Sequence, residues 1–565
     1  RTAAGRAAGI AAAVAVVGAL ACLGWPSLGV PLDYTGDTLS MLSVLETLQE
    51  QLWYWESPRL GVPGTQDLLS FPMTDNGHFA LCKLLVTVGL SPVQAFNLYY
   101  LLTFAAVAAT GAWVLGVLGI SAPLAVFGGA AYALLPYHFL RLQHLFLAAY
   151  YMVPLAVLVL LRWNEPRLHR RTRGLGIAFC FLLPAFGAYY AFFFCYLLSA
   201  AMVLELAVSR DWRVILRAGV LLVATVAGLL VNEAPSLVHG WGATDKAQLV
   251  RPVQDTEVYG LKLIQLLLPA QGHQSPLLAG VTKAYTTTAP LVNENQTTSL
   301  GLVLSLALLA TWLVPLASCW RQDTPHTERD TRLRRLMALS LLAFVFGTIG
   351  GFSSVFGYFV VPFIRSSNRI CVYIAFFAVV GGATLAQGIG DGLRRNARAQ
   401  ALAPVLLAVL ALVWLWDTLD VAYLPNRAKD VAMYESDAAF FADLERDLPA
   451  GARIFQLPYL PYPEGGIQTR DYYPLRPHIN TRQLGWSFGG MRGTRPDGWY
   501  RQTATTLQSS PADFVRVLRR DSFAGVLVQR SLYGETLALE QVLAQALGGP
   551  TRESPNHEFV FFPLR

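Results

Sequence analysis

Long apolar runs separated by short polar connections fill the first three quarters of the chain. A helix needs about 20 apolar residues to cross a bilayer. Pro136 and Pro184 are expected to kink or end two of these helices, because proline removes a backbone donor and clashes with the preceding turn. The first run is long enough to span, so we expect a retained helix and not a cleaved signal peptide. The pattern predicts eleven spans, near residues 7–30, 96–118, 120–137, 145–161, 174–188, 190–208, 214–231, 300–318, 336–350, 370–387 and 401–416.

Three polar segments are too long to be simple connections: 32–95, 232–299 and 417–565. The first predicts two short amphipathic helices around a turn at residues 57–64. The second contains one helical stretch around Tyr259–Leu268. In the third, strand-like runs alternate with helical patterns, which is typical of a small α/β domain. The strands are expected at Arg453–Leu457, Gly525–Gln529 and Phe559–Phe562, and the helices near Ser436–Leu448, Pro511–Asp521 and Glu535–Leu547. We therefore expect a transmembrane domain over residues 1–416 and a C-terminal domain over 417–565.

Composition supports a membrane protein. Hydrophobic residues make up 54% of the 565 residues and charged residues only 14%, whereas a soluble domain carries roughly 25% charged residues. This excludes an ordinary water-soluble enzyme.

The net charge of +7 does not indicate a nucleic-acid partner, because the basic residues gather in short connections between apolar runs. These arginine-rich connections are residues 162–173, 209–217, 319–335 and 388–400. With eleven spans and the N-terminus inside, all four lie on the cytoplasmic side, as the positive-inside rule requires. The C-terminal domain then lies outside, on the periplasmic side of a bacterial inner membrane.

Motifs of soluble enzymes are missing from the sequence: there is no Walker A, H-E-x-x-H or G-x-S-x-G pattern. The six cysteines show no C-x-x-C or His/Cys ligand spacing, so no structural metal site is expected. Chemistry must therefore be sought among the carboxylates and arginines on the outer side of the membrane. Residues 32–95 and 232–299 are called the first and second outer segments.

Asp37 is the first catalytic candidate, because it follows the first span and a glycine turn. A carboxylate next to low-dielectric membrane would have a raised pKa and act as a general base. The alternative is that Asp37 caps the helix that follows it. Asp33 is the competing base.

Arg365 and Arg369, with Asn368 between them, stand at the outer mouth of the tenth span. Guanidinium groups match phosphate oxygens bidentately, which favours a site for a lipid-linked phosphate. Their position opposite the positive-inside connections is not explained by topology. Snorkelling to lipid headgroups is the alternative.

Glu56, Glu233 and His273, from the two outer segments, are candidate contacts for a sugar or acceptor. Each could equally be a solvated loop residue.

A first outer loop with a membrane-proximal aspartate, two short outer helices, a long late outer loop and a C-terminal domain are together similar to the GT-C superfamily of integral-membrane glycosyltransferases. The motifs Gly36-Asp37, Phe71–Asn76, Leu134–His138, Tyr259–Lys262 and Arg365–Arg369 more closely resemble those of YfhO-like bacterial membrane proteins. This resemblance implies that Asp37 matches the catalytic aspartate and that Arg365 or Arg369 matches the phosphate-binding residue. The usual pair of neighbouring acidic residues is here spaced as Asp33 and Asp37, which leaves the identity of the base and a need for Mg²⁺ or Mn²⁺ open.

The resemblance implies an inverting glycosyltransferase that moves a sugar from a polyprenyl-phosphate donor to a cell-envelope glycan, lipid or protein acceptor. Such an enzyme needs a base for the acceptor hydroxyl, a cation for the leaving phosphate and contact with membrane lipids. No nucleotide site is required. The alternatives are a transporter or flippase of lipid-linked saccharide and a non-catalytic envelope assembly partner.

Overall fold

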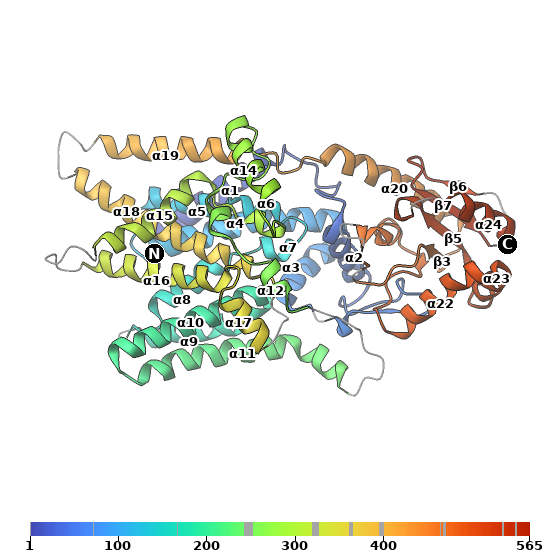
Figure 1. Cartoon of the computed structure of the whole chain (residues 1–565), viewed down its shortest axis with the longest axis horizontal. Coiled ribbons are helices and arrows are strands. Elements are labelled where there is room, and N and C mark those ends of the chain that lie inside the picture. The colour runs from blue at the N-terminus through green and yellow to red at the C-terminus, as the bar shows by residue number, and fades with distance from the viewer. Residues whose placement is uncertain are drawn as a thin grey trace.

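The computed structural model describes residues 2–71, 73–165, 168–241, 252–318, 327–360, 365–394, 401–463, 465–466, 470–533, 536–548 and 551–564. It consists of a bundle of long helices with an α/β domain at one end (Figure 1). The outer segments lie between these two parts, where α2, α3 and α12 are seen in Figure 1. The expected mainly helical, polytopic membrane fold with a small C-terminal α/β domain is confirmed.

Eight segments within the described residues are long and apolar enough to cross a membrane. Seven of them are formed by α1 (Thr2–Cys22), α4 (Pro92–Val117), α10 (Ala188–Ser209), α11 (Arg213–Gly240), α15 (Gly301–Ser318), α18 (Cys371–Arg394) and α19 (Leu402–Leu419). The eighth is the pair α5 (Ala122–Ala133) and α6 (Pro136–Leu140). The other three expected spans also form helices, shorter or more charged: α8 (Val153–Arg162), α9 (Arg170–Leu182) and α16 (Glu328–Gly347).

Both expected proline breaks are present. Pro136 starts α6 after the chain leaves the helix at Leu134. Pro184 lies in the 3-10 turn η2 (Leu183–Phe186), which ends α9. The first span ends earlier than expected, at Cys22, because Gly24 and Trp25 take left-handed backbone conformations and Pro26 follows. α11 continues beyond its expected end at residue 231, through Pro235 to Gly240.

α1 packs on α4 and α5 through a stripe of small residues. Ala7, Ala11, Ala15 and Ala19 recur every four residues and are at most 2% exposed. In a membrane, such stripes let two helix backbones approach closely and gain van der Waals contact.

The first outer segment contains the two expected helices, α2 (Gly36–Glu50) and α3 (Asn76–Thr87). Between them, β1 (Glu56–Ser57) and β2 (Gln66–Asp67) pair as a small antiparallel hairpin that precedes the turn η1 (Leu68–Ser70). The second outer segment is more helical than expected. It contains α12 (Asp255–Val258), α13 (Leu263–Leu267), α14 (Pro276–Thr288) and the 3-10 turn η3 (Glu294–Thr298).

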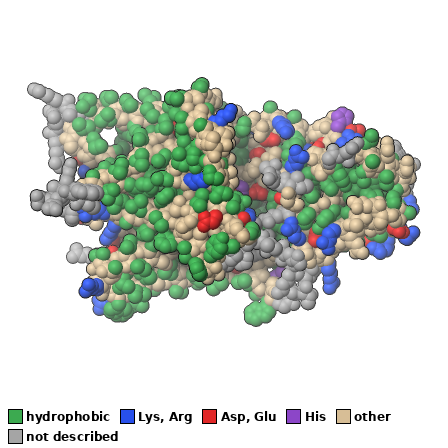
Figure 2. Space-filling view, in the orientation of Figure 1, with side chains coloured by type: hydrophobic (Ala, Val, Ile, Leu, Met, Phe, Trp, Pro, Cys, Tyr) green, Lys and Arg blue, Asp and Glu red, His purple; other side chains and the backbone are tan. Residues whose placement is uncertain are grey.

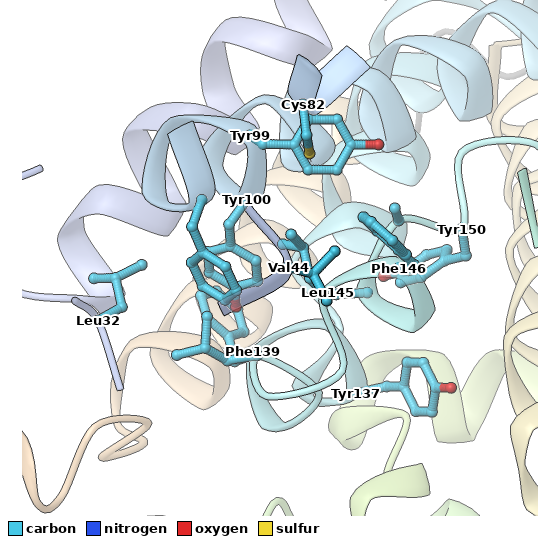
Figure 3. Close-up of a cluster of buried hydrophobic side chains, with 14 of the residues drawn as sticks. Leu32, Val44, Cys82, Tyr99, Tyr100, Tyr137, Phe139, Leu145, Phe146 and Tyr150 are labelled. Atoms are coloured by element: carbon cyan, nitrogen blue, oxygen red, sulfur yellow. The ribbon is translucent and has the colours of Figure 1, made fainter. Parts of the chain in front are cut away.

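A cluster of buried aromatic and aliphatic side chains fixes the outer end of the bundle (Figure 3). It joins α2, α3 and α4 to α6 and to the short helix α7 (Leu145–Ala148). The ring of His78 stacks on Phe146, with 4.8 Å between ring centroids. These contacts hold the turn between α6 and α7 in place. The labelled members are Leu32, Val44, Cys82, Tyr99, Tyr100, Tyr137, Phe139, Leu145, Phe146 and Tyr150.

The C-terminal domain is built on a five-stranded sheet with the order β4-β3-β5-β7-β6. β3 is parallel to both β4 and β5, and β7 runs antiparallel to β5 and β6. The expected strands and helices are all present: Arg453–Leu457 has its expected limits, and the others agree to within nine residues. The strands are β3 (Arg453–Leu457), β4 (Gly485–Trp486), β5 (Phe523–Gln529), β6 (Arg552–Glu553) and β7 (Phe559–Pro563), and the helices are α20 (Arg427–Asp447), α21 (Arg476–Ile479), α22 (Arg495–Ser509), α23 (Pro511–Arg520) and α24 (Leu537–Leu547).

The first outer segment is docked on this sheet. Leu60 forms a parallel bridge to Trp486 of β4. The amides of Gly61 and Val62 donate to the carbonyls of Phe488 and Trp486 at 2.9 and 3.1 Å. Residues 60–62 thus extend the sheet at its β4 edge, and the C-terminal domain is tied to the segment that carries Asp37.

Candidate functional site

Three separate segments meet where the bundle ends and the outer segments begin. Arg141, in the turn after α6, donates to Glu294 of η3 at 2.8 Å. It also donates to the amide oxygen of Asn368 at 3.0 Å, in the 3-10 turn η4 (Ser367–Ile370). Arg369, the next residue, lies 3.5 Å from the same carboxylate. We call Arg141, Glu294, Asn368 and Arg369 the junction cluster.

Local capping explains why Glu294 points into this cluster. The side chain of Asn293 accepts from the amide of Asn295 and starts η3. Asn295 itself is buried and bonds to Gln265 at 2.7 Å and to the carbonyl of Gly260 at 3.0 Å. Asn295 therefore fixes η3, and with it Glu294, against the segment around Gly260.

Charges in the junction cluster do not cancel. Two guanidinium groups face one carboxylate, which leaves one net positive charge. Burial alone would raise the pKa of Glu294, but the charges of Arg369 and Arg141 hold it well below its usual range. Glu294 is therefore an anion that positions the two arginines, and it is not a proton donor or acceptor at neutral pH.

Arg369 has unused capacity within this cluster. Its side chain is 12% exposed, and its Nε makes no hydrogen bond within the described part of the chain. The guanidinium lies over the ring of Tyr189, 4.4 Å from its centroid. A planar donor supported on one face and partly open to solvent suits an incoming anion.

The other two members of the Arg365–Arg369 motif are differently engaged. Arg365 pairs with Asp255 at 2.9 Å and lies over the ring of Tyr259. Asn368 donates to the carbonyl of Tyr259 and to Glu294, both at 2.9 Å. The structure thus assigns different surroundings to residues that look equivalent in the sequence.

Asp37 lies in the first turn of α2 and faces the junction cluster. Thr35 occupies the N-cap position of the helix, so the interpretation of Asp37 as the N-cap residue is wrong. Its carboxylate is 2.8 Å from Nε2 of His144, and its side chain remains 43% exposed. Gly36 must stay glycine, because its φ is +50° and a Cβ would lie 2.7 Å from Gln143.

The expectation of a raised pKa for Asp37 is also wrong. Burial acts to raise the pKa, but the hydrogen bond and charge of His144, and then the charge of Arg369, lower it below its usual value. Asp37 is therefore ionised at neutral pH, and it lies within the electrostatic field of Arg369.

Asp33 closes the turn that precedes α2. It accepts from the hydroxyl of Thr38 at 2.7 Å and from that of Thr35 at 3.0 Å. Burial raises its pKa, against the effect of these hydrogen bonds. Its partners belong to the turn, whereas Asp37 faces the arginine.

Asp75 is a carboxylate that the sequence reasoning did not single out, although it belongs to the Phe71–Asn76 motif, of which Pro72 lies outside the described residues. Burial and the charge of Glu233 raise the pKa of Asp75 to about 7, while the charge of Arg369 opposes this. Glu233 follows Asn232, whose side chain bonds to the carbonyl of Thr74. Asp75 and Asp37 thus both lie within the electrostatic field of Arg369.

Glu56 and His273 are not brought to this junction. Glu56 is exposed in the β1–β2 hairpin. His273 is buried between Asp417 and Asp420 at the end of α19, 3.6 and 3.1 Å away.

A divalent cation would need a set of oxygen or nitrogen ligands. Within the described residues, no group of three His, Cys, Asp or Glu side chains could hold one. At the junction, Asp37 and His144 provide two ligands, and Glu294 is committed to arginines. The arrangement does not fit a metal, and we derive no chemical step through one.

The C-terminal domain reaches the junction through Tyr462, in the loop after β3. Burial raises the pKa of this buried phenol to about 12, where a hydrogen bond with Ser40 lowers it and the charge of Asp37 raises it further. Figure 2 shows acidic side chains gathered in the recess between the bundle and the C-terminal domain.

Comparisons with known proteins bear on the fold. No protein-family model matches the chain, and no curated protein matches its sequence. The crystal structure of ArnT from Cupriavidus metallidurans in the apo state matches with a TM-score of 0.54 and 12% identity, covering 98% of this chain and 97% of that chain. The structure of the same protein bound to undecaprenyl phosphate matches with a TM-score of 0.52, also at 12% identity and with the same coverage. The chain shares the fold of these two structures over essentially its whole length.

Proposed function

We propose that this protein is a glycosyltransferase that moves a sugar from a polyprenyl-phosphate carrier to a cell-envelope glycan, lipid or protein. The observation that carries the proposal is the pairing of an exposed, ionised Asp37 with the partly open Arg369 at the end of the bundle. A base and a phosphate-binding cation are the two groups that transfer from a lipid phosphate requires. A solved structure with the same fold is bound to undecaprenyl phosphate.

The reaction follows from these two groups. The acceptor hydroxyl attacks the anomeric carbon, its proton passes to Asp37, and the carbon–oxygen bond to the phosphate breaks. The bonding electrons go to the phosphate oxygen, where the charge of Arg369 stabilises them. Because negative charge grows there during the reaction, Arg369 binds the transition state more strongly than the ground state. Direct attack assisted by one base inverts the anomeric carbon.

His144 and Glu294 are positioning residues in this scheme. His144 holds the carboxylate of Asp37 at 2.8 Å. Glu294 ties Arg369 to Arg141 and so fixes both guanidinium groups. The lowered pKa of Asp37 keeps it ready to accept a proton over a wide pH range.

The site would face the periplasm of a bacterial inner membrane. Arginines lie at helix ends on the side of the bundle opposite the C-terminal domain. Arg162, at the end of α8, donates to the carbonyl of Val117, and Arg329, at the start of α16, pairs with Asp391. Such an end belongs on the cytoplasmic side. Parts of two arginine-rich connections, 319–326 and 395–400, lie outside the described residues. Reporter fusions after Arg171 and at Pro449 should read cytoplasmic and periplasmic, respectively.

A matched pair of variants tests the chemistry. Purified protein in nanodiscs would be given a panel of polyprenyl-phosphate hexoses and pentoses with an envelope extract as acceptor, and released polyprenyl phosphate would be counted. Asp37→Asn should lower turnover by about 10² or more, while the neighbouring Asp33→Asn keeps most of it. Full turnover in Asp37→Asn, or no release from any donor by the wild type, would refute the proposal.

A further inference from the structure

A second concave site lies in the C-terminal domain, separate from the junction cluster. It is a cavity of about 500 Å³. The side chains that matter here are Tyr459, Arg492, Thr494, Asp497 and Arg501, all of which line it. Nothing in the mechanism above uses these residues.

The cavity lies where this type of fold places ligands. β3 is parallel to β4 on one side and to β5 on the other, so the connection from β3 leads to one side and the next connection, from β4, crosses back over β3 to the other. Tyr459 follows the carboxyl end of β3, and Arg492 and Thr494 follow β4. Ligands of open parallel sheets bind in the crevice outside the carboxyl ends of the strands at such a reversal.

Charge at the cavity is positive. The carboxylate of Asp497 is already bonded, since it accepts from the hydroxyl of Tyr459 at 2.6 Å and from the amide of Gly493 at 2.9 Å. Arg492 and Arg501 both line the same space. Two guanidinium groups beside one hydrogen-bonded carboxylate leave a net positive charge, which favours a carboxylate or phosphate ligand.

A neighbouring cavity extends the site. Its volume is about 550 Å³, and it shares Tyr459 and Arg501 with the first. Apart from these it is lined mainly by apolar side chains, among them Pro458, Leu507 and Tyr533. Aromatic and proline faces suit the C–H faces of a sugar ring. Together the two cavities have room for more than one sugar.

One short loop connects these cavities to the junction. Tyr459 lines both cavities, and Tyr462, three residues later, lies in the field of Asp37 and is hydrogen-bonded to Ser40. Three residues span at most about 11 Å. The amide of Arg492 donates to the carbonyl of Tyr462 at 2.8 Å, which fixes the loop against the cavity.

We infer that this cavity binds an anionic sugar, bearing a carboxylate or a phosphate, within the acceptor glycan. As an acceptor subsite it rests on the proposed function, whereas its affinity for an anionic sugar does not. The bound unit lies a few sugar lengths from the hydroxyl that Asp37 deprotonates. It sets which glycan chains are extended.

Direct binding tests the ligand class without any need for turnover. The full-length protein in detergent would be titrated with glucuronate, glucose 6-phosphate and uncharged glucose, and binding followed by saturation-transfer NMR and calorimetry. One or both anionic sugars should bind at least about tenfold more tightly than glucose, and Arg492→Gln or Arg501→Gln should remove about tenfold of that affinity. Arg516→Gln, an exposed arginine on the adjacent α23, is the matched control and should bind as the wild type does.

The outcomes separate this inference from the proposed function. Asp37→Asn should bind the anionic sugar as tightly as the wild type, even though it does not turn over. With an active donor, Arg501→Gln should raise the KM for acceptor and leave kcat nearly unchanged. Equal affinity for glucose and both anionic sugars, or unchanged affinity in both arginine variants, would overturn the inference whatever the fate of the transferase activity.

Discussion

Two arginine–carboxylate networks at the outer segments use the same types of side chain for different purposes. The first is the junction cluster. The second, which we call the domain lock, consists of Tyr34, Asp437, Arg476 and Glu558, and it joins the first outer segment to the C-terminal domain. In the lock, Arg476 and Asp437 are 1% and 0% exposed and share two hydrogen bonds of 2.6 Å.

The difference lies in what each arginine has left to offer. Arg476 uses its third nitrogen on Glu558 at 3.2 Å, and the rings of Tyr34, Tyr473 and Phe559 cover it. Arg369 has a looser ion pair of 3.5 Å and an Nε without a partner among the described residues. A saturated arginine can only hold the structure together, whereas an incompletely paired one can bind a ligand.

Breaking the lock should have the largest effect. Arg476→Met leaves Asp437 buried without its partner, which costs about 3–5 kcal/mol of stability. We expect a large fall in the thermal unfolding midpoint in detergent, measured by tryptophan fluorescence, with release of the C-terminal domain to protease.

An exposed ion pair on the same helix as Asp437 provides the control. Arg446 and Asp443 are 71% and 65% exposed, so Arg446→Met should cost no more than about 1 kcal/mol. The double variant Arg476→Met with Asp437→Leu should recover most of the loss, because no buried charge remains unpaired. Equal midpoints for Arg476→Met and Arg446→Met would show that the lock does not hold the two parts together.

The junction arginine should show the opposite behaviour. Arg369→Ala should lower turnover about 10² while moving the unfolding midpoint little. Arg369→Lys should recover only part, because lysine keeps the charge but loses the planar fork. Arg365→Ala, which removes the arginine paired with Asp255, should keep most activity, measured by release of polyprenyl phosphate.

If Arg365→Ala instead removes turnover and Arg369→Ala does not, then Arg365 is the phosphate-binding residue and Arg369 is not. Simple headgroup contact would leave all three variants active in a fixed detergent.

Part of the fold could be predicted from the sequence. Apolar length and the periodicity of the tail predicted the spans and the strands, because both depend on local pattern. The bridge and backbone bonds that residues 60–62 make to the sheet could not be predicted, since their partner β4 lies more than 400 residues away and the segment carries no strand pattern of its own.

The site shows the same division. Asp37 and Arg369 could be chosen from residue type and place relative to a span. Arg141, His144 and Glu294 could not, because their roles arise only when separate turns meet. The pKa of Asp37 was predicted in the wrong direction, since proximity to the membrane suggested burial but not the bond to His144.

His144 offers a finer test of the junction. Removing it in His144→Ala takes away the hydrogen bond that lowers the pKa of Asp37, so that pKa should rise. As the pH falls, Asp37 would then become protonated at a higher pH than in the wild type. Activity at the acidic end of the kcat/KM profile should therefore fall several-fold. His144→Gln, which can still donate a hydrogen bond, should shift the acid limb less. An unmoved acid limb in His144→Ala would show that this contact does not set the ionisation of Asp37.

The smallest expected effect concerns Asp75, whose pKa is raised to about 7. As pH rises through this value, Asp75 gains a negative charge close to Arg369 and Glu233, which weakens the positive field that attracts the donor phosphate. The affinity for donor should therefore fall by about threefold between pH 6 and 8. Asp75→Asn cannot ionise and should flatten this fall, whereas Glu56→Gln, an exposed acid in the same outer segment, should retain it. Donor KM measured at several pH values decides the matter, and an unchanged slope in Asp75→Asn would show that Arg369 is as insulated from its neighbours as Arg476 is in the lock.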